Sequence, residues 1–263
     1  MAHLLETERQ IAESIRMARE SCSPIAPIGG ALAPQDLRAA YRIQALNAEA
    51  WMRAGRSRTG RKVGLTSNAV QKQLGVDQPD SGVLLDSMAI PDGGRVDPAR
   101  CMQPKVEAEI AFLLDREIDA ELLKRGRIAD AIALAYPAIE ICDSAIADWR
   151  IGIVDTIADN ASSGFYVIGE SGVPLEAFDP QACTMTMEVN GAVVSTGTGE
   201  ACLGNPLNAL RWLAETTLGQ GDPLQAGELV LSGALGPMAP VAPGDMVRAE
   251  IEGLGSVSVS FGE

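Results

Sequence analysis

Histidine is almost absent from this sequence, in which the only one is His3, close to the N-terminus. This absence argues against a Ser-His-Asp triad, a histidine-ligated zinc site and a histidine general base. The five cysteines are odd in number and form no C-x-x-C pair, so neither a disulfide framework nor a zinc cluster is expected. Any chemistry must therefore use carboxylates, lysine, hydroxyl groups, the backbone or a cofactor.

Long apolar runs and aromatic side chains are also scarce. No run of about 18 apolar residues occurs, and the charged start MAHLLETERQ lacks the apolar core of a signal peptide. We therefore expect no membrane span and a cytoplasmic location. Aromatics make up 4% of the residues against 46% hydrophobic residues, which predicts a core of Ala, Val, Leu and Ile. The net charge of −14 disfavours nucleic acid as a partner, because an acidic chain repels phosphate backbones.

Helical periodicity is confined mainly to the start of the chain. The spacing predicts one amphipathic helix over 4–20 and a second over 34–54. The buried stripe of the first helix is expected to contain Leu4, Ile11, Ile15 and Ala18. The buried face of the second is expected to contain Leu37, Tyr41, Ala45, Ala48 and Met52. We interpret residues 1–59 as a helical N-terminal segment and residues 60–263 as the main domain.

After residue 60 the pattern changes to short apolar runs cut by glycine, proline and aspartate. Strands are predicted over 61–65, 106–114, 138–142, 164–169, 184–191, 191–197 and 228–233, with a closing hairpin over 246–253 and 255–261. Helices are predicted over 68–74, over 127–135 and from Asn205-Pro206 onward. This mixture of elements favours an α+β fold built around a mixed, strongly curved sheet.

Carboxylates stand inside two of the predicted strands. In VEAEIAFLL, Glu107 and Glu109 share one face, with Cα atoms roughly 6–7 Å apart. Glu140 lies in PAIEIC, where it is the only charge, and burial of an unpaired carboxylate is energetically costly. Three carboxylates on apolar strands suit a hard cation such as Mg²⁺ or Mn²⁺. From spacing alone, the alternative is an acidic strand face exposed to solvent.

Four more residues are candidates with simpler alternatives. Lys62, in GRKVGLTS, either orients a carboxylate near a metal or is a surface strand lysine. Asp80, in QPDSG, is a base or, on pattern alone, a turn residue. Ser162, in IADNASSGFYVIG, belongs either to a turn or cap or to the rim of a pocket. Ser232 begins the glycine loop SGALGPM, which either passes close to a ligand or is an ordinary turn.

Several of these stretches together resemble a known family. They are GRKVGLTSNAVQKQLGVDQPDSG, VEAEIAFLL, PAIEICDSAIADWRIGIVDTIADNASSGFYVIG, GEACLGNPLNALRWLA, VLSGALGPM and GLGSVSVSF, and they span residues 60–262. The chain resembles the 2-hydroxypenta-2,4-dienoate (2-keto-4-pentenoate) hydratases of the fumarylacetoacetate hydrolase superfamily. The resemblance implies a mixed, curved β-roll of the fumarylacetoacetate hydrolase C-terminal-domain type, with flanking helices, a helical N-terminal segment and assembly into a homo-oligomer.

The resemblance also implies roles for the candidate residues. The metal ligands would be Glu107, Glu109 and Glu140, binding Mg²⁺ or Mn²⁺, and the metal-binding roll over 60–263 would be the catalytic domain. Active-site residues would be Lys62 and Asp80, and we expect the substrate to contact Ser162 and Ser232. One departure is Ser81, which stands where an aromatic residue is expected after the aspartate of the P-D-x-G segment. It leaves the size of the substrate open.

The implied activity is metal-dependent addition of water to a small 2-hydroxy-dienoate in the degradation of aromatic compounds. Whether Asp80 or the metal activates the water stays open. One alternative is a 4-oxalocrotonate-type decarboxylase, which needs a cation for a second carboxylate and could use Arg61, Lys105 or Arg150. Another is a non-catalytic subunit that associates with a pathway partner enzyme. A fumarylacetoacetate-type C–C hydrolase is disfavoured by the lack of a spare histidine.

Overall fold

Two α-helices open the chain, as the periodicity predicts. The computed structural model describes residues 2–33, 35–67, 71–72 and 76–263. Helix α1 spans Ala2–Ser21 and α2 spans Leu37–Arg53, beginning where the Asp36 side chain accepts a hydrogen bond from the Ala39 N–H. The predicted stripe of α1 is buried at Ile11, Ile15 and Ala18. The side chain of Leu4, its fourth member, lies outside the described part of the chain.

The buried face of α2 differs from the prediction at two positions. Ala45 is exposed and Met52 is 38% exposed, whereas the buried face includes Ile43 and the polar side chains Gln44 and Asn47. Gln44 Nε2 donates hydrogen bonds to the carbonyl oxygens of Ser81 and Ile157. A face that contains amides with such partners cannot be identified from apolar spacing alone.

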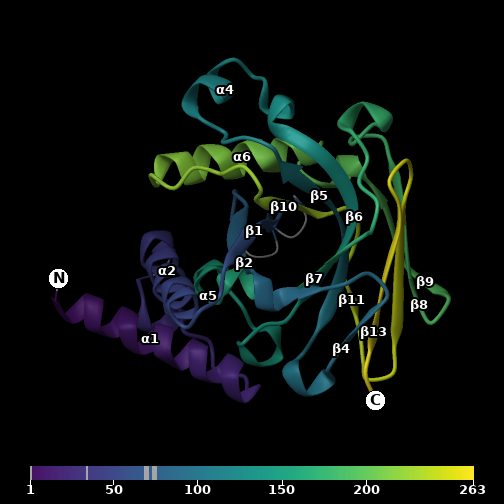
Figure 1. Ribbon diagram of the computed structural model, residues 1–263. Coiled ribbons are helices and arrows are strands. Elements are labelled where there is room, and N and C mark those ends of the chain that lie inside the picture. Colours follow the sequence, from purple (N-terminus) through teal and green to yellow (C-terminus); the bar gives the residue numbers. More distant parts are fainter. Residues whose placement is uncertain (1, 34, 68–70, 73–75) are drawn as a thin grey trace.

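A large curved sheet forms the centre of the molecule (Figure 1). Its strand order is β2-β1-β10-β5-β6-β7-β3, and β11 pairs with β5. Strands β1 and β10 are parallel, whereas β1–β2, β10–β5, β5–β6 and β6–β7 are antiparallel, so the predicted mixed sheet is confirmed. The strands are β1 (Arg58–Gly64), β2 (Asp80–Leu85), β3 (Ala89–Ile90), β5 (Lys105–Leu114), β6 (Ile132–Cys142), β7 (Ser163–Ile168), β10 (Leu229–Ala234) and β11 (Ala239–Pro240).

A second sheet of five strands has the order β4-β13-β12-β8-β9. Its strands are β4 (Gly94–Val96), β8 (Thr184–Val189), β9 (Ala192–Thr198), β12 (Met246–Ile251) and β13 (Gly255–Phe261). Strands β12 and β13 form the predicted closing hairpin and pack against β6 of the curved sheet. Between the two sheets lies the main hydrophobic core, to which β5 contributes Val106, Ala108 and Ile110. The intervening residues of β5 therefore point to the other face of the curved sheet.

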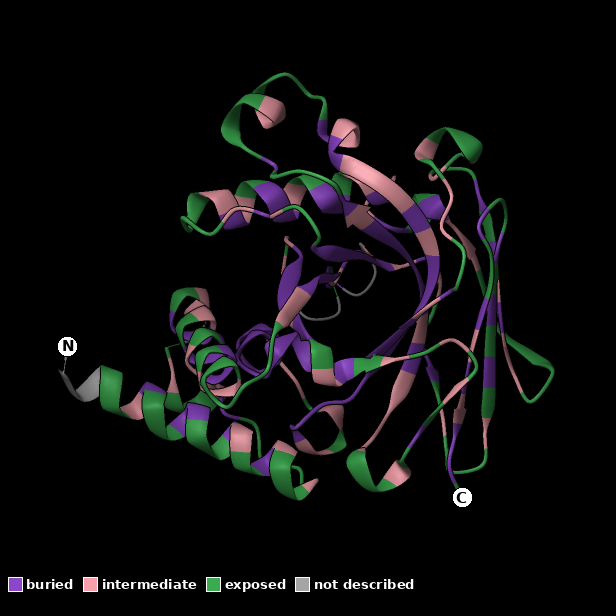
Figure 2. Cartoon of the chain, in the orientation of Figure 1, coloured by how far each residue is buried: buried purple, intermediate pink, exposed green. Residues whose placement is uncertain are grey.

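Helices α4, α5 and α6 pack on the sheets in the described part of the chain. Helix α4 spans Ala120–Lys124, α5 spans Ile153–Ala158 and α6 spans Pro206–Gly219. The predicted start of α6 is confirmed, because the Asn205 side chain accepts a hydrogen bond from the N–H of Leu207. Figure 2 shows the buried residues concentrated on the strands of the curved sheet and the inner faces of the helices. No helix in the described ranges is long and apolar enough to cross a membrane.

The predicted helix over 127–135 is wrong. Only Ile128–Ala131 forms a single 3₁₀ turn, and β6 begins directly afterwards at Ile132. A short apolar run fits a buried strand as well as a helix, and pairing with β5 decides for the strand here. Strand β6 continues through Pro137, whereas the predicted strand began only after this proline. The short helix predicted over 68–74 falls mostly on residues outside the described ranges.

The N-terminal helices pack onto the region around α5. Side chains of α1, α2 and α5 form one buried apolar cluster, which includes Ile15, Ile43 and Ile157. At the end of α1, the Arg19 guanidinium lies 2.7 Å from the buried Asp159 carboxylate. Arg19 also donates to the carbonyl oxygen of Ser163. These contacts fix the segment that joins α5 to β7.

Candidate functional site

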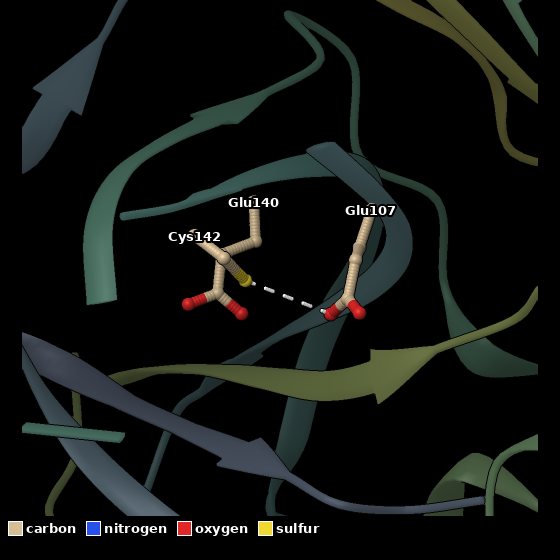
Figure 3. Close-up of side chains that lie close together, drawn as sticks. All are labelled: Glu107, Glu140 and Cys142. Carbon is tan, nitrogen blue, oxygen red and sulfur yellow. Dashed lines mark hydrogen bonds between the residues drawn. The ribbon is translucent and has the colours of Figure 1, made fainter. Parts of the chain in front are cut away.

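Three glutamates lie together on one face of the curved sheet. Glu107 and Glu109 are two residues apart on β5, and the register places Glu107 directly opposite Glu140 of β6. In Figure 3 the side chains of Glu107, Glu140 and Cys142 project from these two strands toward one another. The predicted strand alternation therefore holds, and the pairing of β5 with β6 adds the third carboxylate to the same face.

The three carboxylates are shielded from water. Glu109 is 0% exposed, Glu140 is 1% exposed and Glu107 is half-buried, so a solvent-facing acidic strand is excluded. Burial, together with the charge of Glu140, raises the pKa of Glu107 to about 7. The same two causes raise the pKa of Glu109 well above its usual range. Without a cation, the cluster would therefore hold protons near neutral pH.

Several of the carboxylate oxygens are buried without a hydrogen-bond donor in the described part of the chain. They are both oxygens of Glu140 and Oε1 of Glu109, and of these only Oε1 of Glu140 has an ion pair, with Lys62. The other oxygen of Glu109, Oε2, accepts a hydrogen bond of 2.7 Å from the N–H of Gly233. Buried oxygens without donors are costly, and a bound cation would satisfy them. The residues present therefore fit a divalent metal ion.

The tightest group of potential ligands in the described residues contains a thiol. Ligand atoms of Glu107, Glu140 and Cys142 all lie within 4.8 Å of one another, whereas Glu109 is outside this group. The Cys142 Sγ is 3.8 Å from Glu107 Oε2. Sequence reasoning missed Cys142, although strand alternation after Glu140 was the signal that would have placed it on this face.

Lys62 lies beside the carboxylates on β1. Its side chain is buried, so the alternative of a surface lysine is excluded, and its Nζ is 3.1 Å from Oε1 of Glu140. Burial by itself would lower the pKa of Lys62, but the charge of Glu140, with smaller contributions from its neighbours, raises the pKa overall. Lys62 therefore remains protonated and acts as a fixed cation next to Glu140.

Asp80 is not a turn residue, because it begins β2 and is 1% exposed. The Thr156 hydroxyl of α5 donates a hydrogen bond of 3.1 Å to its Oδ2. Burial raises the pKa of Asp80, although Lys62 and Thr156 oppose the shift. Gly64 lies opposite Asp80 in the register, and a Cβ at Gly64 would collide with the Asp80 carboxylate. The local P-D-S-G pattern indicated a turn and gave no sign that Asp80 is buried.

Ser162 lies in a strained turn next to Thr156, the residue that donates a hydrogen bond to Asp80. Residues 160–162 have φ angles of 56°, 52° and 53°, the left-handed region that residues other than glycine rarely adopt. The Ser162 hydroxyl is buried and lies 3.5 Å from the Thr156 hydroxyl. The Asn160 side chain bonds both backbone groups of Val83 on β2. The turn therefore holds β2, which carries Asp80, against α5.

Ser232 has backbone partners inside the sheet. Its hydroxyl accepts a hydrogen bond from the N–H of Ile110 and donates one to the carbonyl of Gly233. The adjacent N–H of Gly233 contacts Glu109, so the predicted glycine loop passes next to the carboxylates. The hydrogen bonds of Ser232 hold the backbone of Gly233 close to Glu109.

Tyr41 of α2, which was predicted only as part of a buried helix face, also lies at the site. The Ser81 hydroxyl donates a hydrogen bond of 3.4 Å to the Tyr41 Oη. Burial and the nearby charge of Asp80 raise the pKa of Tyr41 to about 12. Tyr41 thus brings an aromatic ring to the position at which Ser81 departs from the expected pattern. No local signal links these two residues, because they lie on different elements.

The fold and the site together define an α+β protein with a buried carboxylate cluster suited to a divalent cation. The chain belongs to the fumarylacetoacetate (FAA) hydrolase C-terminal family, whose model matches residues 54–261. The resemblance inferred from the sequence motifs is therefore confirmed.

Named relatives cover nearly the whole chain. The chain is 50% identical over 250 residues to 2-keto-4-pentenoate hydratase 2 of Dechloromonas aromatica (strain RCB), with 95% of each protein covered. It is 39% identical to 2-hydroxyhexa-2,4-dienoate hydratase of Comamonas testosteroni, with 98% of each covered. Among solved structures, 4-oxalocrotonate decarboxylase from Pseudomonas putida G7, complexed with magnesium and adipate, superposes with a TM-score of 0.93 at 33% identity. That comparison covers 97% of each chain.

Proposed function

We propose that this chain is a divalent-metal-dependent hydratase. Its substrate would be 2-hydroxypenta-2,4-dienoate, also written 2-oxopent-4-enoate, and its product 4-hydroxy-2-oxopentanoate, in the degradation of aromatic compounds. The observation that carries the proposal is the buried group of Glu107, Glu109 and Glu140 beside the cation of Lys62. The likeness to named hydratases over nearly the whole chain supports the reaction class.

The proposed metal ligands are Glu107, Glu109 and Glu140. Their oxygens suit Mg²⁺ or Mn²⁺, because these hard ions prefer carboxylates and water. The buried oxygens without donors support this assignment. When bound, the ion would supply Lewis-acid stabilisation of negative charge on the 2-oxygen of the substrate.

Lys62 and Asp80 are the proposed catalytic residues. The protonated Nζ of Lys62 orients the Glu140 carboxylate and offers positive charge to the carboxylate of the substrate. The raised pKa of Asp80 suits a group that takes up and returns a proton at its carboxyl during hydration. Thr156 donates a hydrogen bond to Oδ2 of that carboxyl and so holds its orientation. Burial of these groups limits the access of bulk water.

Substrate contacts at Ser162 and Ser232 are part of the same proposal. Ser162 is linked through Thr156 to Asp80, and Ser232 lies beside the loop that reaches Glu109. A substrate that binds between Asp80 and the glutamates would pass close to both serines. Of the two, Ser162 has the weaker protein contact, a hydroxyl pair at 3.5 Å.

A decarboxylase would need a cation for the distal carboxylate of its substrate. The three candidates all have other partners. The buried Arg61 lies 2.8 Å from Asp222, and Arg150 lies 3.7 Å from Asp148. The Nζ of Lys105 stands 4.3 Å from the ring centre of Trp149. This distribution of charge favours a substrate with a single carboxylate.

The product of turnover tests the proposal. The isolated full-length chain, supplied with Mg²⁺ or Mn²⁺ and 2-hydroxypenta-2,4-dienoate, should form 4-hydroxy-2-oxopentanoate detectable by NMR. With 4-oxalocrotonate it should release no carbon dioxide. Efficient carbon dioxide release would instead assign the chain to the decarboxylases. Absence of any turnover without a second protein would favour the silent-subunit alternative.

The state of the protein in the cell is a further part of the proposal. The five cysteines are unpaired, which suits a reducing cytoplasm. We propose a cytoplasmic homo-oligomer, as the family resemblance implies, and we further propose that it associates with a pathway partner enzyme. Sedimentation of the purified protein, alone and with that partner, measures both assemblies.

A further inference from the structure

The proposed hydratase reaction does not involve the thiol of Cys142, which lies among the proposed metal ligands. Cys142 is two residues after Glu140 on β6, and its buried Sγ lies 3.8 Å from Glu107 Oε2. Figure 3 shows the thiol between the two carboxylates, with the three side chains converging from adjacent strands. Their ligand atoms lie within 4.8 Å of one another.

A second observation points to a ligand at this place. Glu140 is 1% exposed, and its Oε2 has neither a hydrogen bond nor an ion pair in the described residues. The other oxygen, Oε1, forms an ion pair of 3.1 Å with the Nζ of Lys62. Glu140 therefore faces the Cys142 thiol and Glu107 with unused acceptor capacity.

We propose that Glu107, Glu140 and Cys142 form a thiophilic metal site that overlaps the catalytic one. It would bind Zn²⁺ or Cd²⁺ and so exclude the hard ion that supports hydration. The proposal rests on the proposed function in one respect, since the two sites share Glu107 and Glu140. Its consequence is inhibition of the enzyme by soft divalent ions, in competition with Mg²⁺.

The chemistry distinguishes the two kinds of ion. Soft thiolates select Zn²⁺ and its heavier relatives, whereas Mg²⁺ prefers oxygen and leaves a thiol protonated. With Zn–S near 2.3 Å and Zn–O near 2.1 Å, a tetrahedral ion separates sulfur from oxygen by about 3.6 Å. The Cys142 thiol donates a hydrogen bond of 3.8 Å to Glu107 Oε2, and this distance between Sγ and Oε2 is close to that separation. On binding, a metal–sulfur bond replaces the S–H bond, the proton leaves to solvent, and nothing is oxidised.

The test measures Cd²⁺ and Mg²⁺ binding by the chelated full-length protein. Cd²⁺ is titrated while the ultraviolet thiolate-to-cadmium absorption and the free Cd²⁺ are followed, and Mg²⁺ affinity is measured by calorimetry. Cys142→Ser removes the thiol, and Cys142→Ala replaces it if the serine variant does not fold. The matched control is Cys183→Ser, a buried cysteine outside the ligand group. The control should keep both the absorption and the Mg²⁺-supported turnover.

We expect the wild type to show the absorption and the Cys142 variants to lose it. Their Cd²⁺ affinity should fall about 10- to 100-fold, with a much smaller change in Mg²⁺ affinity. Equal Cd²⁺ affinity in wild type and Cys142→Ser would overturn the thiophilic site and leave the hydratase proposal intact. Failure of the wild type to bind any divalent ion, Mg²⁺ included, would overturn both.

Discussion

At the scale of single residues, the contact between Lys62 and Glu140 brings two buried charges of opposite sign together. Nζ of Lys62 lies 3.1 Å from Oε1 of Glu140, and both side chains are buried. Removal of one partner leaves an uncompensated buried charge on the other. Lys62 therefore holds Glu140 in place, and in the proposed mechanism it also keeps a positive charge beside the substrate.

Lys62→Met tests these effects separately. We expect turnover to fall by about 100-fold or more, because the fixed cation that faces the substrate is lost. Mg²⁺ affinity should be maintained or increased, because removal of a nearby positive charge favours cation binding. Steady-state kinetics at saturating Mg²⁺ and calorimetry measure the two quantities. Lys124→Met, an exposed lysine of α4, is the control, and a Lys62 variant as active as this control would refute the role.

At the scale of elements, β2 and α5 position Asp80. The Thr156 hydroxyl donates to Asp80 Oδ2 and lies 3.5 Å from Ser162 in the strained turn that follows α5. Asn160 of that turn bonds the backbone of Val83 on β2, so turn and strand are held in register. The orientation of the Asp80 carboxyl is thus a property of three elements together.

Thr156→Val should preserve the fold and weaken catalysis. Loss of one hydrogen bond to Asp80 is expected to lower kcat about 3- to 10-fold and to shift the pH profile of kcat. Thr156→Ser keeps the hydroxyl and should restore both values. A valine variant with the wild-type profile, or a serine variant as impaired as valine, would show that this hydrogen bond does not position Asp80.

Strand alternation explains how much of the site the sequence could predict. Glu107 and Glu109 stand two apart in an apolar run, and Glu140 is the only charge in another, so local patterns indicated the cluster but left an exposed acidic strand face as the alternative. Asp80 was interpreted from its pattern as a turn residue, because nothing local shows that β1 and α5 cover it. Tyr41 and Thr156 reach the site only through tertiary packing, whereas strand alternation after Glu140 could have indicated Cys142.

For the fold too, local patterns predicted some elements, whereas others were decided by tertiary packing. Strands and the closing hairpin were predicted from short apolar runs cut by turn residues, α1 from its apolar stripe and α6 from its start at Asn205-Pro206. The region 127–135 was assigned to a helix because a short apolar run has no period that separates the two structures. Pairing of Ile132 and its neighbours with β5 resolved it as a strand.

At the scale of the whole molecule, the N-terminal helices support the catalytic region. Arg19 of α1 bonds Asp159, and Gln44 of α2 bonds the carbonyls of Ser81 and Ile157. These contacts reach the same strand and helix that carry Asp80 and Thr156. The helices therefore stabilise the site although they contribute none of its proposed metal ligands.

The central claim is that the glutamate cluster makes hydration depend on a divalent ion. The most direct measurement is the loss of dienoate absorbance by wild type and by the Glu107→Gln/Glu109→Gln variant, each with Mg²⁺ and after chelation. We predict that wild-type turnover disappears on chelation and returns with Mg²⁺ or Mn²⁺. The double variant should be inactive with an unchanged circular dichroism spectrum. Full activity in the double variant, or in thoroughly chelated wild type, would contradict the claim.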